Sequence, residues 1–152
     1  MRINWMRALL GGLLAGLIVN ICETITNGLF LGSYWANAMK ALHVSPATGI
    51  VSIVVFWMWG FLMGLYAIWL YASVRPRYGA GPRTALIAGL AVWVPGCLLA
   101  MVTPAVLHMF RYRLIAMDVG LGLVELLLGT LAGAWIYKEA AAPAPKAAAA
   151  AA

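Results

Sequence analysis

The chain has 152 residues, of which 65% are hydrophobic and only 9% are charged. A soluble domain carries charge at roughly a quarter of its positions, so this composition excludes a water-soluble fold and predicts a single integral membrane domain. The formal net charge of +6 does not indicate nucleic-acid binding, because the basic residues lie at the ends of the apolar runs, where they anchor helices at the membrane interface.

Four apolar segments are long enough to cross a bilayer, which takes about 20 helical residues. They cover roughly residues 8–31, 49–73, 84–108 and 113–137. The basic start and the first apolar run lack a small-residue cleavage site, so we interpret the first segment as an uncleaved span. The sequence therefore predicts an all-α, four-helix membrane bundle over residues 1–139. Residues 140–152 form an Ala/Pro-rich low-complexity tail.

The connections between these segments differ in character. Residues 32–48 are expected to form a polar-aromatic loop that ends in a helix-entry signal, Ser45-Pro46. The second connection is rich in Pro, Gly and Arg, and the third is a tight turn. The third span contains Pro95 and Pro104, which predict bends because each proline leaves a helix carbonyl without its partner. Such a bend either packs against a neighbour or opens a cavity.

The basic residues are divided unequally between the two sides of the predicted bundle, with seven on one side and three on the other. The larger group comprises Arg2, Arg7, Arg75, Arg77, Arg83, Lys138 and Lys146, and the smaller comprises Lys40, Arg111 and Arg113. Because cytoplasmic segments are enriched in Lys and Arg, we expect both termini in the cytoplasm, in a multi-pass protein of a bacterial inner membrane. Arg75, Arg77 and Arg83 are candidates for contacts with anionic lipid headgroups, although purely topogenic charge explains them as well.

Two pairs of short matches indicate a duplicated helical hairpin. ALLGGL at 8–13 resembles ALIAGL at 85–90, and Trp-Leu-Tyr at 69–71 resembles Trp-Ile-Tyr at 135–137. The two repeats would run parallel. Convergent membrane composition explains the matches equally well.

Spaced glycines recur in three of the spans. G-x-x-x-G pairs let helix backbones approach closely in lipid, where the hydrophobic effect does not drive helices together. The pairs are Gly12 and Gly16 in the first span, Gly60 and Gly64 in the second, and Gly129 and Gly133 in the fourth. These glycines are candidate packing residues for the bundle itself, for self-association, or for contact with other membrane subunits.

Only four acidic residues occur, and three of them fall inside predicted spans. An ionised carboxylate at bilayer depth is costly, so it is usually paired, protonated or facing a polar cavity. Helical spacing places Asn20, Glu23 and Asn27 on one face of the first span, and Asp118 and Glu125 on one face of the fourth. At a rise of about 1.5 Å per residue, the two glutamates lie at comparable depths, with Asp118 nearer the outer edge.

Two interpretations of these polar residues remain open. In the first, Glu23 is protonated or hydrogen-bonded, and the neighbouring Asn and Thr side chains bond between helices. In the second, Glu23 and Glu125 share a proton or cation site, with Asn20, Asn27 and Asp118 around it.

Trp57 and Trp93 lie too deep in their spans to anchor an interface. Tryptophans at this depth usually pack in the core, but they could also line a cavity whose aromatic faces attract a cation. His43 and His108 lie at or beyond the outer edges of their spans, away from the carboxylates. The sequence therefore predicts no metal site and no cofactor.

No catalytic triad, phosphate loop or paired-cysteine motif is present, so nothing supports an enzyme. The sequence favours a small accessory or scaffold subunit packed into a larger membrane assembly. One alternative is a proton- or cation-coupled transporter built on Glu23 and Glu125. Another is a cofactor-bearing redox subunit, which only the two histidines support. The expected partners are the lipid bilayer and other membrane subunits or further copies of the chain.

Overall fold

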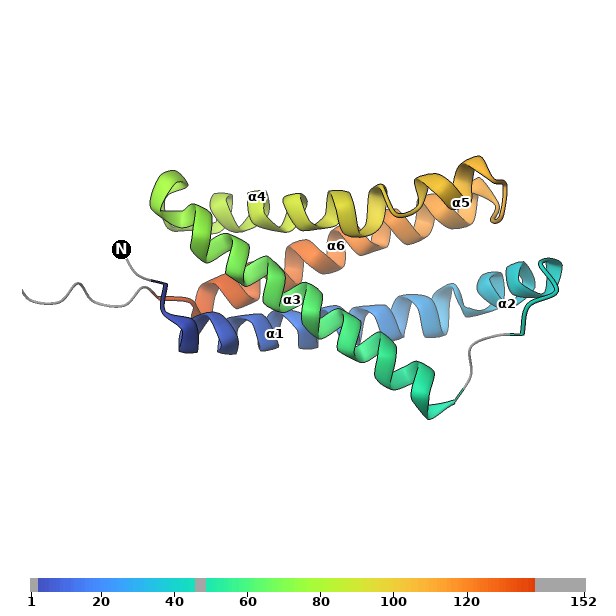
Figure 1. Cartoon of the computed structure of the whole chain (residues 1–152), viewed down its shortest axis with the longest axis horizontal. Coiled ribbons are helices and arrows are strands. Elements are labelled where there is room, and N and C mark those ends of the chain that lie inside the picture. The colour runs from blue at the N-terminus through green and yellow to red at the C-terminus, as the bar shows by residue number, and fades with distance from the viewer. Residues whose placement is uncertain (1–2, 46–48, 139–152) are drawn as a thin grey trace, which may run out of the picture.

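The computed structural model describes residues 3–45 and 49–138, and every regular element within them is helical (Figure 1). Four helices are long and apolar enough to cross a membrane: Trp5–Phe30, Ile50–Tyr78, Pro82–Val106 and Tyr112–Ile136. For this part of the chain, the all-α class and the four apolar spans are confirmed. The low-complexity tail lies outside the described residues, as do Arg2 and Lys146.

The first and third spans are interrupted, whereas the second and fourth are continuous. The first consists of α1 (Trp5–Glu23) and a π-helical segment, η1 (Thr24–Phe30), and it leads into α2 (Gly32–Ala41). The third consists of α4 (Pro82–Trp93), a second π-helical segment, η2 (Val94–Leu98), and α5 (Val102–Val106). The second and fourth spans are α3 (Ile50–Tyr78) and α6 (Tyr112–Ile136).

In the π-helical segments, backbone hydrogen bonds join residues five positions apart instead of four, which makes the helix wider there. In η2, Pro95 has no backbone N–H, and the amide of Leu99 bonds to the Val94 carbonyl at 2.8 Å. The expected bend at Pro95 is therefore a wide turn. In η1 the amide of Leu31 bonds to the Thr26 carbonyl at 2.7 Å. This segment has no proline, and no pattern in the sequence predicted it.

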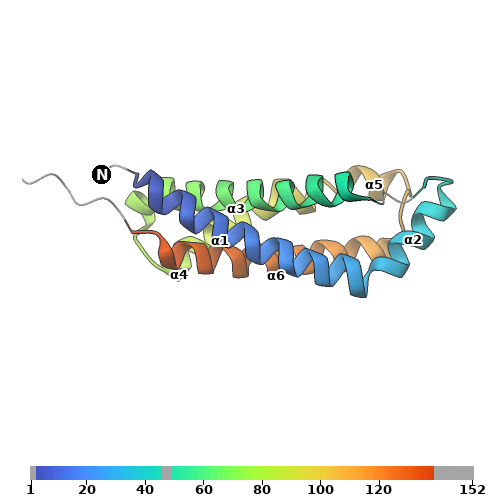
Figure 2. The ribbon, with the colours of Figure 1, turned by 90° about the horizontal axis from the view of Figure 1, so that it is seen from below.

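The four spans form a ring in which α1 and α4 each pack against both α3 and α6. The start of α1 and the end of α6 lie together at one end of the bundle, which we call the terminal end (Figure 1). α2 and α5 lie at the opposite end, which we call the α2 end. The same arrangement is visible after a quarter turn (Figure 2).

Glycines bring the backbones of α1 and α3 into contact. A Cβ added at Gly12 would lie 2.8 Å from Cα of Leu65, and one added at Gly64 would lie 2.5 Å from Cα of Gly16. Real Cβ atoms essentially never approach closer than 3.0 Å. The crossing of α1 and α3 therefore has no room for a side chain at these positions. Gly60, on the same helix, faces the side chain of Asn20.

α1 and α6 approach each other in the same way. A Cβ at Gly129 would lie 2.8 Å from the carbonyl oxygen of Ala15, and one at Gly11 would lie 2.5 Å from the carbonyl oxygen of Gly133. By contrast, nothing lies within 4 Å of a Cβ built on Gly28. Close approach thus depends on the position of a glycine in the bundle, since G-x-x-x-G spacing also occurs at Gly28 and Gly32.

A pair of tyrosines connects the helix ends at the terminal end. The rings of Tyr71 and Tyr137 pack edge to face, with centroids 5.9 Å apart. The backbone amide of Gly81 donates to the hydroxyl of Tyr71 at 3.3 Å, and that of Asn4 donates to the hydroxyl of Tyr137 at 3.4 Å. These contacts tie the start of α1 to α6, and the end of α3 to the start of α4. Small side chains fill the core beside them: Ala8, Ala15, Ala72, Ala85, Ala88 and Ala134.

Two local expectations differ from the structure. Residues 32–41 form α2 and not a loop, because Leu31 is buried and Trp35 is half-buried, so that the segment has an apolar side to pack. α3 continues to Tyr78, beyond the expected end near residue 73, and Gly79 at φ 84° closes it by bonding to the Arg75 carbonyl at 2.8 Å. Residue 46, in the expected entry signal, lies outside the described residues.

Candidate functional site

Glu125 is the most deeply buried carboxylate among the described residues. Glu125 is only 3% exposed, and it lies on α6, which packs against the first span. The hydroxyl of Thr26 donates to Oε1 of Glu125 at 2.7 Å. Thr26 belongs to η1, and follows Glu23 by three residues, which places both on the same side of the helix.

Glu23 lies beside this buried group but is itself exposed on the surface of the chain. The side-chain amide of Asn27 donates to Oε2 of Glu23. Glu23 is close enough to Glu125 for a direct side-chain interaction, and its charge also acts on Asp118. The structure thus brings together the two glutamates that the sequence singled out. One is buried, and the other is open to the surroundings.

Asp118 completes the acidic group on the side nearer the α2 end. It is half-buried on α6 and is close enough to Asn27 for a side-chain interaction. Cys97 of η2 is within electrostatic range of Glu23, Asp118 and Glu125. η1, η2 and α6 therefore meet around the carboxylates. We call Glu23, Thr26, Asn27, Asp118 and Glu125 the carboxylate cluster.

A hydrogen-bond chain extends from the carboxylate cluster to α2. The indole N–H of Trp35 donates to Oδ1 of Asn27 at 2.8 Å, while the amide of the same Asn27 side chain donates to Glu23. Trp35 also packs edge to face on Phe110, with centroids 5.1 Å apart. The orientation of Asn27 is therefore fixed from both sides.

Asn20 has a different role from the other members of its predicted face. It is 2% exposed, and its side-chain amide donates to the backbone carbonyl of Trp57 at 3.0 Å. The backbone carbonyl of Asn20 accepts a hydrogen bond from the hydroxyl of Thr24 at 2.7 Å. Asn20 thus bonds α1 to α3, as the interhelical interpretation expected.

The two deep tryptophans occupy unlike positions. Trp57 is 42% exposed, and its ring contacts Phe61 at a centroid distance of 6.5 Å. Trp93 is half-buried, and its indole N–H donates to the carbonyl of Val119 at 2.9 Å. Trp93 therefore joins α4 to α6 near Asp118, whereas Trp57 contributes its backbone carbonyl to the α1–α3 crossing.

The candidate lipid-binding arginines lie at the terminal end, away from the carboxylate cluster. Arg75 is half-buried, with its guanidinium 5.5 Å from the centre of the Tyr137 ring. Arg77 is exposed and lies 5.9 Å from the ring centre of Tyr78, and Arg83 is also exposed. The three side chains therefore do not form one uniform surface.

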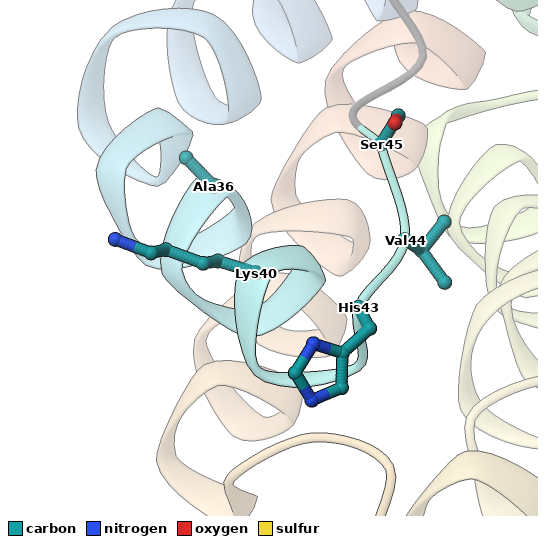
Figure 3. A pocket seen from close by; sticks show the side chains of 5 residues that line it. All are labelled: Ala36, Lys40, His43, Val44 and Ser45. Carbon is teal, nitrogen blue, oxygen red and sulfur yellow. The ribbon is translucent and has the colours of Figure 1, made fainter.

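The α2 end carries two hollows. One, of about 480 Å³, is open and is lined by Ala36, Lys40, His43, Val44 and Ser45. In Figure 3 the side chains of Lys40 and His43 extend in different directions and do not converge on a common point. The other, of about 670 Å³, lies between α2 and the turn that joins α5 to α6.

Thr26 was among the Asn and Thr side chains expected to bond between helices, and it donates to Glu125 of α6. Two other residues near the carboxylates, Trp35 and Cys97, were missed from the sequence. Trp35 was missed because its segment was expected to be a loop. Cys97 approaches the carboxylates only through the wide turn of η2.

No group of three or more His, Cys, Asp or Glu side chains arranged to hold a metal occurs in residues 3–45 and 49–138.

Comparison with known proteins adds no relative. No protein-family model, curated protein or solved structure matches the chain. By the length and composition of its helices, the chain belongs to the multi-pass membrane proteins of all-helical architecture. Its function has to be argued from its own site.

Proposed function

We propose that this chain is a small proton- or cation-coupled membrane transport protein whose ion site is the pair Glu23 and Glu125. The supporting observation is the proximity of a buried carboxyl group and an exposed one at membrane depth. Two neighbouring ionised carboxylates repel each other strongly where the dielectric constant is low. The pair therefore holds a proton or a cation between its two members.

The surroundings suit such an exchange. Thr26 and Asn27 supply a hydroxyl and an amide to the two glutamates, so each carboxyl keeps a partner when it gains or loses a proton. Glu23 is exposed on the surface of the chain, while Glu125 is enclosed. The π-helical segments η1 and η2 border the pair, and such segments often mark functional sites in helices.

The direct test is ion movement and ion-dependent stability of the purified protein. In proteoliposomes with an internal pH-sensitive dye, wild-type protein should carry protons or exchange them for an added monovalent cation. Glu23→Gln and Glu125→Gln should each abolish the signal while folding normally. Thr130→Val is the matched control, because Thr130 is also buried on α6 and bonds only within its own helix. Wild-type activity in both glutamine variants would make the carboxylates structural.

A second function, the accessory or scaffold subunit of a larger membrane assembly, is favoured by one specific observation. Glu23 and Thr24 are exposed at membrane depth, and the first turns of α3 from Ile50 to Trp59 are almost entirely uncovered. A carboxylate facing lipid is costly, so another chain would cover this side in the membrane. Native purification followed by mass spectrometry should then recover stable partner subunits. A lone chain or a simple homo-oligomer would count against this role.

The proposed orientation has both termini in the cytoplasm. The terminal end holds Arg7, Arg75, Arg77, Arg83 and Lys138, whereas the α2 end holds Lys40, Arg111 and Arg113. The imbalance follows the enrichment of basic residues on the cytoplasmic side. A bacterial inner membrane is the corresponding location.

A duplicated hairpin is the proposed origin of the bundle. Ala8, Gly11, Gly12 and Ala15 are buried in α1, and Ala85, Ala88, Gly89 and Val92 are buried in α4 at one constant offset. A second constant offset relates buried residues of α3 to those of α6 and the residue that follows it. Gly60, Gly64, Ala67, Ile68 and Tyr71 match Leu126, Thr130, Gly133, Ala134 and Tyr137. At these offsets Glu23 matches Ala100 and Glu125 matches Trp59, so the ion site belongs to one pair of helices alone.

A further inference from the structure

The larger hollow at the α2 end has the properties of an anion site. It has a volume of about 670 Å³, within the usual range for small-molecule sites. Its polar lining comes from two elements. α2 contributes Tyr34 and Asn37, and the turn into α6 contributes His108, Arg111, Tyr112 and Arg113. We call this hollow the α2-end groove.

The positive charge of the α2-end groove is not neutralised by the chain itself. No acidic residue occurs between Glu23 and Asp118 in the sequence, so α2, α5 and both connections at this end carry none. Among the described residues, no ion pair or hydrogen bond engages the side chain of Arg111 or Arg113. Both guanidinium groups therefore keep their forked donors for a ligand.

The start of α6 adds to this charge. Arg111 is the residue that precedes the helix, and no side chain caps the helix there. The first turn of α6 contains no acidic residue. The first amides of a helix have no intrahelical partner, and they carry the positive end of the helix dipole. Arg111 and Arg113, together with the other first residues of α6, Tyr112 and Leu114, thus line the same groove.

The walls of the α2-end groove are held in place without a ligand. The edge-to-face contact of Trp35 with Phe110 fixes α2 against the turn. His108 has φ 51°, and its Nδ1 lies 3.1 Å from the hydroxyl of Tyr112. A groove that is already shaped loses less entropy when a ligand binds.

We propose that the α2-end groove binds a phosphate-bearing anion, held by Arg111, Arg113 and the first amides of α6. Arginine forks match the oxygens of phosphate in bidentate pairs, and Asn37 and the tyrosine hydroxyls can bond the remaining oxygens. The volume exceeds that of an inorganic ion, so the ligand is a phosphate ester with an organic body. The ester is either a water-soluble molecule or the headgroup of a phospholipid in the adjacent leaflet.

The test uses the full chain in detergent, with inorganic phosphate and glycerol phosphate as soluble probes. Wild-type protein should bind glycerol phosphate more tightly than inorganic phosphate by isothermal titration calorimetry. The double variant R111Q/R113Q should bind it at least about tenfold more weakly, because charge-assisted hydrogen bonds are lost. R77Q/R83Q removes the same charge from the terminal end and is the matched control, which should bind like wild type.

A second arm identifies the source of the phosphate. The protein is reconstituted in phosphatidylcholine nanodiscs with and without phosphatidylglycerol, and the lipid that it retains is measured by native mass spectrometry. Retention of phosphatidylglycerol that depends on Arg111 and Arg113, without binding of glycerol phosphate, would assign a lipid headgroup. Binding of glycerol phosphate in both membranes would assign a soluble ester.

Two results would overturn the proposal. One is equal binding of all probes by wild type and R111Q/R113Q, and the other is an equal loss in R77Q/R83Q, which would indicate net charge alone. Arg113→Lys covers the case in which the double variant does not fold. It keeps the charge but removes the bidentate fork, so it should weaken phosphate binding while leaving thermal stability in the absence of ligand unchanged.

Discussion

The hydroxyl of Thr26 donates to Oε1 of Glu125 at 2.7 Å, and so joins the first span to the fourth. Glu125 is almost fully buried, and this is its hydrogen bond to another helix. The wide turn of η1 contains the donor, and the glycine contacts between α1 and α6 hold the two helices close enough for it to reach. The geometry of the carboxylate cluster therefore depends on backbone packing closer to the terminal end.

Replacement of Thr26 by Val should destabilise the bundle. The change keeps the shape of the side chain but leaves Oε1 of Glu125 without its donor, at a cost of about 1–3 kcal/mol for a buried acceptor. Reversible unfolding in mixed micelles, followed by circular dichroism, measures the effect. Thr24→Val is the matched control, since the Thr24 hydroxyl bonds only to the Asn20 carbonyl in its own helix. Equal effects of the two changes would show that the bond to Glu125 contributes nothing specific.

Gly64→Ala should weaken the crossing of α1 and α3. The added Cβ would meet the backbone of Gly16, which cannot move without separating the helices. Overpacking of this kind costs about 1–3 kcal/mol. Gly120→Ala in α6 serves as the control, because nothing lies within 4 Å of a Cβ there. The control should be neutral or more stable, by up to about 1 kcal/mol, from the higher helix propensity of alanine. A Gly64→Ala variant as stable as the control would mean that the close approach has no energetic weight.

Arg75→Met should be more damaging than Arg77→Met. Arg75 is half-buried with its guanidinium over the ring of Tyr137, whereas Arg77 is exposed beside Tyr78. Loss of a partly desolvated cation–π contact and its packing costs about 1–2 kcal/mol, and the exposed contact is worth less. Thermal unfolding in detergent compares the two variants. The reverse order would assign the larger role to the interface with lipid.

The sequence was sufficient for the architecture and for part of the site. Hydropathy located the four spans, because a bilayer requires long apolar helices whatever their contacts. Helical spacing placed Glu23 and Glu125 on faces of small or polar residues. The structure buries Glu125 but leaves Glu23 exposed on the surface of the chain beside it. Helical spacing could not distinguish the role of Asn20 from that of Asn27, since the two share a helix face but bond to different partners. That difference arises from the wide turn of η1 and from the approach of α3 at Gly60.

Helix positions that depend on distant contacts were also beyond sequence patterns. α2 is short and only partly apolar, and it is positioned by the contact of Trp35 with Phe110, far along the chain. The uneven burial of Arg75 and Arg77 follows from where Tyr137 ends the fourth span. Such pairs become visible only when the spans are packed together.

The proposed orientation predicts which end of the bundle can be labelled from outside. In a background with Cys22 and Cys97 replaced by Ala, a cysteine at Ala36 should react with a membrane-impermeant maleimide in intact cells. A cysteine at Arg77 should react only after the membrane is opened. Both positions are exposed on the chain, so accessibility reports the side of the membrane and not burial. The opposite pattern would place the termini outside.

Glu23 and Glu125 should be energetically coupled. If the two share one proton or cation, Glu23→Gln and Glu125→Gln should each remove the dependence of unfolding on pH or cation concentration, and the double variant should lose little more. In a double-mutant cycle this appears as a coupling energy of about 0.5–3 kcal/mol, as expected for groups in contact. The control cycle pairs Glu125→Gln with Arg77→Gln, whose effects should add because Arg77 lies at the terminal end. Additive losses in both cycles would mean that the two carboxylates act separately and that the shared ion site does not exist.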